Sequence, residues 1–253
     1  MDLELKNKVI LVTGSSQGIG FAIAKRLYDE GASLILNGKN QTKLKKAAEK
    51  IGDRVDFVVA DVTDQQQCKK IIEQIQMQFG RLDILVCNVG SGASVKPGAE
   101  TADEWQRMMK INLSSTTNMV EAAKGLLGVS KGSIVCISSI CGHEVISGAP
   151  VTYSAAKAAL NAYIKGIARP LGEQGIRINA VSPGNILFDG SVWEKKLTED
   201  ESKVKEMLNK EVALKRLGKV SEIADFVAFL VSPKAAFSTG AVYVIDGGQV
   251  RHG

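Results

Sequence analysis

The chain has 253 residues, 45% hydrophobic and 23% charged, which is typical of a globular protein long enough for one large α/β domain. Its net charge of +5 comes from 32 basic and 27 acidic residues without any basic block interleaved with aromatic residues, so no nucleic-acid surface is expected. No apolar run is long enough to span a membrane, and residues 1–6 lack the basic start and apolar core of a signal peptide. We therefore expect a cytoplasmic protein that binds neither nucleic acid nor membrane.

Short β-type runs alternate with longer helical patterns along the chain. Strands are expected at residues 9–13, 33–37, 55–61, 82–88, 133–138, 176–182 and 241–245, which are mostly apolar, as buried parallel strands are. The first helix is expected to stop at Gly31, and a late helix is expected to have Ser221 as its N-cap. This alternation predicts a single domain over residues 1–253, with a doubly wound sheet, helices on both faces, and a ligand crevice beyond the carboxyl ends of the strands.

Residues 13–20, Thr-Gly-Ser-Ser-Gln-Gly-Ile-Gly, follow the first strand and lead directly into a helix. Glycines here would let the backbone approach a pyrophosphate, and the helix N-terminus would supply free N–H groups. The expected cofactor contacts are Gly14, Ser16, Gln17, Gly18, Ile19 and Gly20. Because the spacing differs from Gly-x-Gly-x-x-Gly, a tight turn without a ligand is the alternative.

The ends of the second and third strands bear on the choice of nucleotide. No acidic residue that would bind a ribose 2′-hydroxyl follows the second strand, and Lys39 stands there instead. Its charge could bind a 2′-phosphate, so we expect NADP(H); if Lys39 is only an exposed loop residue, NAD(H) is the alternative. Asp61 and Val62 could flank the adenine, although Asp61 could equally cap the following turn.

Polar residues also end the fourth and fifth strands. Asn88 could tie neighbouring strands together through its amide while Gly90 leaves room for the cofactor ribose, and a turn without a ligand is the alternative. Ser138 and Ser139 end the fifth strand, where a hydroxyl could bind the substrate oxygen. Serine is also common at strand ends for reasons of turn geometry.

A polar stretch, residues 188–211 with Trp193, interrupts the alternation after the sixth strand. Immediately before it, Pro183, Gly184 and Ile186 could close the crevice from its far side. We expect a loop-plus-helix lid over about residues 186–213, since long insertions at this face often carry substrate specificity. A mobile surface excursion is the alternative.

Tyr153 and Lys157 lie four residues apart in an alanine-rich helical pattern, so their side chains can share one face. A cation about 4 Å from a phenol favours the phenolate, which predicts a lowered pKa for Tyr153 and a role as general acid/base. The alternative is an amphipathic helix with an exposed lysine. Asn112 is a polar residue in a largely apolar helical stretch, and its partner is either a proton-carrying water near Lys157 or ordinary core groups.

The four cysteines show no zinc-ligand or Cys-x-x-Cys spacing, and only two histidines accompany them. They are Cys68, Cys87, Cys136 and Cys141. We expect buried free thiols and no metal. A cysteine nucleophile with His143 as its base is the alternative, but no third, orienting residue can be identified from the sequence.

The segments TGSSQGIG, CNVG, INLSS, ISSICG, YSAAK and SPG, in this order, are similar to the motifs of the short-chain dehydrogenase/reductase family over nearly the whole chain. The resemblance implies a seven-stranded Rossmann sheet, a small-molecule substrate, a homotetramer, and hydride transfer between a nicotinamide and the substrate. It makes Asn112, Ser139, Tyr153 and Lys157 the catalytic residues. Tyr153 would exchange the proton, Ser139 would hold the substrate oxygen, Lys157 would lower the pKa of the phenol and bind the ribose, and Asn112 would hold a relay water.

Four residues depart from the family pattern, and one of them is Cys87, which stands where the first asparagine of the usual Asn-Asn-Ala-Gly turn is found. Val89 adds bulk beside the cofactor where alanine is usual. Phe188 stands where a threonine often contacts the nicotinamide amide, so the backbone of Ile186 would have to supply that contact. Gln17 replaces a basic residue found in many NADP-preferring members, which leaves Lys39 alone to favour NADP(H).

The sequence leaves two functions open. The first is an NADP(H)-dependent oxidoreductase that interconverts a carbonyl and a secondary alcohol, with a 3-oxoacyl thioester or a sugar or polyol as substrate. The polar residues 91–96 and 143–144 favour a hydroxylated substrate, and no arginine-rich docking site for an acidic carrier protein is apparent at residues 126–131 or 173–175. The second is a cofactor-binding scaffold or sensor without turnover, against which the intact set of four catalytic residues argues.

Overall fold

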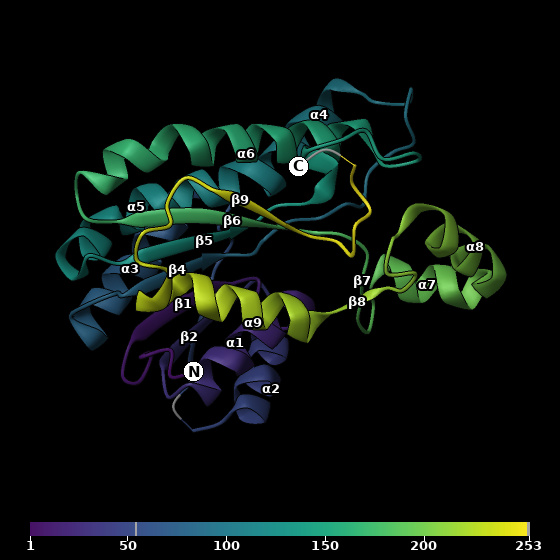
Figure 1. The fold of residues 1–253 in the computed structure, drawn as a ribbon. Coiled ribbons are helices and arrows are strands. Elements are labelled where there is room, and N and C mark those ends of the chain that lie inside the picture. Colours follow the sequence, from purple (N-terminus) through teal and green to yellow (C-terminus); the bar gives the residue numbers. More distant parts are fainter. Residues whose placement is uncertain (54, 252–253) are drawn as a thin grey trace.

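A computed structural model describes residues 1–53 and 55–251, which are built around one seven-stranded sheet (Figure 1). The strands are β1 (Val9–Thr13), β2 (Ser33–Gly38), β3 (Val55–Val59), β4 (Ile84–Cys87), β5 (Ser133–Ile137), β6 (Arg177–Pro183) and β9 (Val242–Ile245). They lie in the order β3-β2-β1-β4-β5-β6-β9, and all neighbours are parallel. The strand order reverses between β1 and β4, which confirms the predicted doubly wound α/β Rossmann fold. Strands β3 and β4 are shorter than the predicted ranges.

Helices cover both faces of the sheet (Figure 1). One face carries α1 (Gly18–Asp29), α2 (Gln41–Ile51) and α9 (Val220–Val231), and the other carries α3 (Gln65–Phe79), α5 (Ser115–Ser130) and α6 (Val151–Gly172), with α4 (Ala102–Met109) ahead of α5. Leu27 and Val227 are buried in the core of the first face, and Ile71 and Leu160 in that of the second. Alternate strand residues point into the two cores, which explains why the strands read as nearly continuous apolar runs. None of the described helices is both long and apolar enough to cross a lipid bilayer.

The ends of two helices test the capping predictions. Helix α1 ends at Asp29, and Gly31 has a φ of +85°, so the predicted glycine stop is confirmed. The prediction of Ser221 as an N-cap is wrong, because α9 already begins at Val220. The N-cap is Lys219, two residues earlier, and its backbone N–H donates to the carboxylate of Glu222 at 2.8 Å.

The segment between β6 and α9 stands beside the sheet, at the right of Figure 1. It consists of β7 (Ile186–Leu187), α7 (Val192–Glu199), α8 (Glu201–Glu211) and β8 (Gly218–Lys219). Val204, Leu208 and Val212 form a small core of their own, separate from the two cores of the sheet. Strands β7 and β8 pair in parallel and join the two ends of the segment. The sequence predicted a loop and a helix here; it missed the second helix because Asp200, which caps α8, divides the pattern into two short pieces.

Candidate active site

The carboxyl ends of β1, β4, β5 and β6 border one open cleft with about 360 Å³ of space. Of the predicted site residues, it is lined by Gly14, Gln17, Gly18, Ile19, Asn88, Gly90, Ser139, Tyr153, Lys157, Pro183, Gly184 and Ile186. The predicted residues outside its lining are Ser16, Gly20, Lys39, Asp61, Val62 and Asn112. The chain thus brings the glycine turn and the Tyr153–Lys157 helix to the same cleft.

The other lining residues are Ser91, Gly92, Ile137, Ser138, Phe188, Ser191, Val192 and Trp193. From the sequence, Ser138 is an alternative to its neighbour, Ser91, Phe188 and Trp193 are loop or lid positions, and the others are not singled out. Ser191 caps α7, since its hydroxyl accepts the N–H of Glu194 at 3.1 Å. A serine ahead of a helical pattern is a recognisable cap signal, which could have located the start of α7. The first turn of α7 therefore forms one wall of the cleft.

The turn between β1 and α1 depends on glycine. Gly14 and Gly18 have φ values of +62° and +60°, which side chains disfavour. A Cβ at Gly18 would lie only 2.8 Å from the ring of Phe188. The N-cap residue Gln17 makes no side-chain cap, and the first turn of α1 contains no acidic residue. The first N–H groups of α1 are therefore left for an anion, and the turn fits the pyrophosphate of a dinucleotide.

Asn88 ties the loop after β4 to this turn. Its Nδ2 donates to the carbonyl oxygens of Thr13 at 3.2 Å and Gly14 at 3.0 Å. A Cβ at Gly20 would lie 2.4 Å from the same nitrogen, so that position accepts only glycine without a shift of the loop. The amide tie that the sequence suggested is present.

Tyr153 and Lys157 both line the cleft from α6. Lys157 Nζ lies 5.9 Å from the centroid of the Tyr153 ring and donates to the carbonyl of Ile137 at 2.8 Å. The lysine is only 2% exposed, and a Cβ at Gly90 would lie 3.0 Å from its Nζ. The loop after β4 can pass this close to the ammonium only because residue 90 has no side chain.

Burial, more than the neighbouring cation, sets the pKa of both groups. It raises the pKa of Tyr153 to about 12, and a hydrogen bond with the Ser139 hydroxyl opposes this shift in part. It lowers the pKa of Lys157 to about 8. The prediction that Lys157 brings the phenol pKa down is wrong here, because loss of hydration outweighs the attraction. At pH 7 Tyr153 is therefore a neutral acid beside a cationic lysine.

The two serines after β5 have different partners. The Ser138 hydroxyl donates to Asn161 Oδ1 at 2.6 Å and so fastens the end of the strand to α6. The Ser139 hydroxyl accepts the N–H of Cys141 at 3.2 Å and lies close enough to the phenol of Tyr153 to lower its pKa. Of the two, Ser139 is thus the one available beside the acid, although the sequence periodicity alone did not separate them.

Asn112 lies in a π-helical segment, Lys110–Ser114, between α4 and α5, where the sequence predicted ordinary helix. It is fully buried. Its Oδ1 accepts the N–H of Ser91 at 2.9 Å, and its Nδ2 donates to the carbonyls of Ser91 and Met108, both at 3.1 Å. Both amide hydrogens have protein partners, as an ordinary buried asparagine requires. A relay water would therefore depend on the main chain of Asn112.

Two lysines gather near the ends of β2 and β3. Lys39 is 74% exposed, and its Nζ lies 3.7 Å from Asp61 Oδ2. Asp61 also accepts the N–H of Thr63 at 3.0 Å, so it does cap the next turn. Lys43 was missed by the sequence reasoning; its Nζ donates to Gln17 Oε1 at 3.4 Å. Its position in the first turn of the helix after β2 was the available signal.

The cysteines do not form a reactive centre. All four are free thiols, and only Cys141 is not fully buried. Burial raises the pKa of Cys141, which disfavours the thiolate. His143 Nε2 lies 3.0 Å from the Ser182 hydroxyl. Within residues 1–53 and 55–251, no group of three or more His, Cys, Asp or Glu side chains could hold a metal ion.

The buried ammonium predicts a pH-dependent stability. Between pH 8 and 10.5 the unfolded chain binds more protons at Lys157 than the folded one, so the contribution of Lys157 to the free energy of unfolding should rise with pH in this range, whereas the buried thiols, whose pKa is raised by burial, contribute in the opposite direction. Below pH 8 the burial of the charged Lys157 side chain lowers the free energy of unfolding by about 3 kcal/mol.

Lys157→Met removes this penalty but loses the hydrogen bond to Ile137, worth about 1 kcal/mol, so we expect the free energy of unfolding at pH 7 to rise by about 2 kcal/mol. Urea unfolding of the wild type and of Lys157→Met at pH 7 and 10 measures this difference in stability.

The control is Lys165→Met, which changes an exposed lysine on the same helix. It should leave both the stability and its slope with pH unchanged. A Lys157→Met protein that is less stable than the wild type at pH 7 would contradict the prediction.

Comparisons with known proteins agree with this geometry. Residues 14–249 match a family described as Enoyl-(Acyl carrier protein) reductase. The 3-oxoacyl-[acyl-carrier-protein] reductase FabG of Thermotoga maritima is 34% identical over 254 residues, covering 98% of this chain and 100% of that protein. FabG of Escherichia coli K12 is 32% identical over 248 residues, covering 98% and 99%.

Two solved structures are closely similar. L-sorbose reductase from Gluconobacter frateurii, complexed with NADPH and L-sorbose, has a TM-score of 0.92 at 30% identity and 99% coverage of both chains. An NADPH-bound short-chain oxidoreductase from Pseudomonas aeruginosa PAO1, described as containing an atypical catalytic center, has a TM-score of 0.91 at 27% identity, with 98% of this chain and 100% of that one covered. The chain therefore belongs to the short-chain dehydrogenase/reductase family and is an enzyme that interconverts carbonyl and alcohol groups with a nicotinamide cofactor.

Proposed function

We propose that this enzyme is an NADP(H)-dependent carbonyl reductase in which Asn112, Ser139, Tyr153 and Lys157 form the catalytic set. The observation that carries the proposal is the convergence, in one cleft, of an uncapped helix N-terminus that suits a pyrophosphate and a partly buried Tyr153 with Ser139 beside it. A bound nicotinamide supplies the hydride. The remaining chemistry is the transfer of one proton to the substrate oxygen.

Tyr153 is the proton donor in this scheme. With a pKa of about 12 its phenol stays protonated at neutral pH and can donate to the oxygen of a carbonyl substrate. Ser139, which lines the cleft beside the phenol, holds that oxygen. The Lys157 cation stabilises the negative charge that develops on the phenol oxygen as its proton leaves. Asn112 fixes the Ser91 backbone beside this group.

A sugar or polyol is the substrate class we favour, with a 3-oxoacyl thioester as the second candidate. Ser91, Ser139, Ser191 and Trp193 belong to the lining of the cleft, which suits a small hydroxylated molecule. The similarity to a reductase complexed with L-sorbose supports the first candidate, and the similarity to FabG proteins supports the second. The loop at 143–144 lends no support, because neither residue lines the cleft.

The assembly and the lid are also proposals. We infer a cytoplasmic homotetramer that uses α5, α6 and β9, because β9 ends the sheet with partly exposed apolar side chains and Val129 of α5 and Val151 of α6 are exposed. Residues 186–213 act as a substrate lid within a single domain, since α7 contributes Val192 and Trp193 to the cleft.

The proton transfer is tested with Tyr153→Phe, which keeps the ring and removes the hydroxyl. The rate of carbonyl reduction should fall about 1000-fold while NADPH still binds, because general acid catalysis contributes about 10²- to 10⁴-fold. NADPH absorbance against a panel of ketoses, polyols and 3-oxoacyl thioesters measures the rate, and NADPH fluorescence measures binding. Equal rates for the variant and the wild type would favour the scaffold or sensor instead. Turnover of thioesters alone would reverse the substrate assignment.

The preference for NADP(H) is tested at the two lysines near the end of β2. Lys39→Gln and Lys43→Gln should each lower kcat/KM for NADPH about tenfold and leave that for NADH unchanged, since a hydrogen bond to a charged group contributes about 1.5 to 3 kcal/mol. Lys45→Gln, an exposed lysine of the same helix, is the matched control. A wild-type protein that turns over NADH faster than NADPH would end the proposal.

A further inference from the structure

The loop between β4 and α4 covers the two side chains of α6 that line the cleft. A Cβ at Gly92 would lie 3.8 Å from Cε1 and Cζ of Tyr153, and one at Gly90 would lie 3.0 Å from Lys157 Nζ. The backbone of this loop is therefore the wall against which the phenol and the ammonium rest. A shift of the loop changes the space in which the phenol can move.

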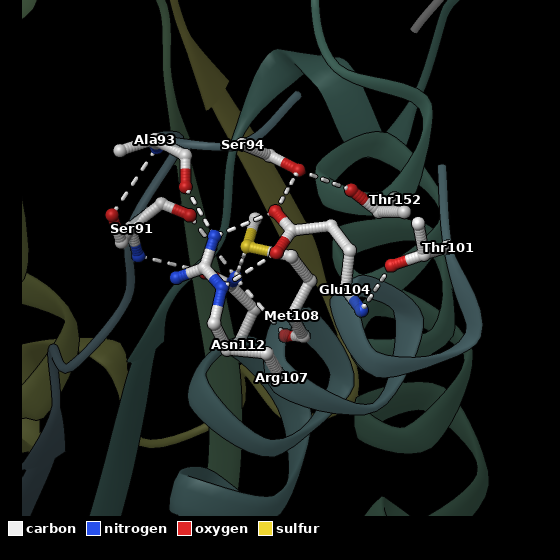
Figure 2. Close-up of polar contacts among 9 residues, drawn as sticks. All are labelled: Ser91, Ala93, Ser94, Thr101, Glu104, Arg107, Met108, Asn112 and Thr152. Atoms are coloured by element: carbon white, nitrogen blue, oxygen red, sulfur yellow. Dashed lines mark hydrogen bonds and ion pairs between the residues drawn. The ribbon is translucent and has the colours of Figure 1, made fainter. Parts of the chain in front are cut away.

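Two side chains form hydrogen bonds with the main chain of this loop, one just before and one just after Gly92 (Figure 2). Asn112 bonds both the N–H and the carbonyl of Ser91, at 2.9 and 3.1 Å. Arg107 Nη2 donates to the carbonyl of Ala93 at 2.7 Å. Gly92 has no side chain of its own to make contacts, so its position is set by the hydrogen bonds to Ser91 and Ala93.

Glu104 connects the same loop to the start of α6. Figure 2 shows the Ser94 hydroxyl between Glu104 and Thr152. Ser94 Oγ donates to Glu104 Oε1 at 2.5 Å and lies 2.7 Å from Thr152 Oγ1. Thr152 is fully buried and directly precedes Tyr153. A chain of hydrogen bonds thus runs from α4 through the loop to the helical turn that carries the phenol.

Arg107 and Glu104 hold each other in a bidentate pair. Arg107 Nε donates to Glu104 Oε2 at 2.7 Å, and Nη2 donates to Oε1 at 2.6 Å. The Glu104 side chain is 13% exposed, and its N–H donates to the capping Thr101 hydroxyl at 3.2 Å. The bond from Arg107 lowers the pKa of Glu104 to about 2, so the carboxylate stays ionised at neutral pH. Such a pair adds fixed geometry even where its net stabilisation is small.

We propose that Arg107 and Glu104 are positioning residues for proton transfer by Tyr153. They fix the loop at Ala93 and Ser94 and, through Thr152, the first turn of α6. A loosened loop lets the phenol move away from the substrate oxygen, which slows the chemical step. The glycine turn that suits the pyrophosphate is bonded to Asn88, at the start of the loop, and not to Ala93 or Ser94, so we expect cofactor binding to change little. The inference rests on the proposed carbonyl reduction.

The test compares kcat and cofactor binding in matched variants. Arg107→Gln should lower kcat about 10- to 100-fold and leave the Kd for NADPH within about twofold. Thr152→Val, which keeps the shape and removes the hydroxyl, should lower kcat in the same way, whereas Thr152→Ser should retain the wild-type value. The double variant Arg107→Gln/Thr152→Val should be about as slow as the slower single variant, because both changes break the same chain of bonds.

The ion pair between Glu121 and Lys124 on α5 is the matched control, since it has the same i,i+3 spacing and an N–O distance of 2.7 Å but touches neither the loop nor α6 in the contacts described here. Lys124→Gln should leave kcat unchanged. If Arg107→Gln lowers only the melting temperature and keeps the wild-type kcat at 25 °C, or if the losses in the double variant multiply, the inference is wrong. If the wild type itself reduces no carbonyl compound with NADPH, the proposed function is wrong and the inference falls with it.

Discussion

The burial of the Lys157 ammonium is the constraint on which the remaining site depends. An ammonium that is 2% exposed is costly, and its lowered pKa, about 8, measures that cost. A carbonyl oxygen at the end of β5 compensates in part. In the proposed mechanism this cost has a use, because the cation lies beside Tyr153, where negative charge would develop when the phenol gives up its proton. Stability is thus lost at Lys157, whose charge the proposed proton transfer needs.

Close packing around this ammonium explains why the site motifs contain glycine. Three segments far apart in sequence, the loop after β4, the end of β5 and helix α6, meet within a few ångströms of one another. A Cβ at Gly90 would lie 3.0 Å from Lys157 Nζ, and one at Gly142 would lie 2.7 Å from the Lys157 carbonyl carbon. Glycine at position 142, three residues after Ser139, therefore has a steric cause. After β5 the chain places the Ser139 hydroxyl near the phenol and then passes directly over the backbone of α6, where a side chain would not fit.

The sequence predicted the sheet, the cleft and the residues that meet there, because these follow from hydrophobic period, strand ends and ordered motifs. It failed where the result depends on distances across the fold. The pKa of Tyr153 is one case, since helical spacing shows that Lys157 is near but says nothing of the burial that raises this pKa. The π-helical segment at Asn112 is another, because its apolar pattern fits an ordinary helix equally well. Lys43 was missed because its contact with Gln17 joins two successive βα units, and the sequence does not show which side chains of the two units meet.

The same burial favours the protonated phenol, which is the form that the proposed carbonyl reduction uses. At neutral pH Tyr153 keeps its proton, so it is ready to donate to a substrate oxygen, as carbonyl reduction requires. Oxidation of an alcohol needs the phenolate, and burial opposes its formation. The Ser139 hydroxyl and the Lys157 cation can stabilise the phenolate against the effect of burial, provided that their own positions are fixed. Because both must keep their place relative to the phenol, the hydrogen bonds that fix the loop and the first turn of α6 belong to the proton-transfer machinery as much as the acid itself.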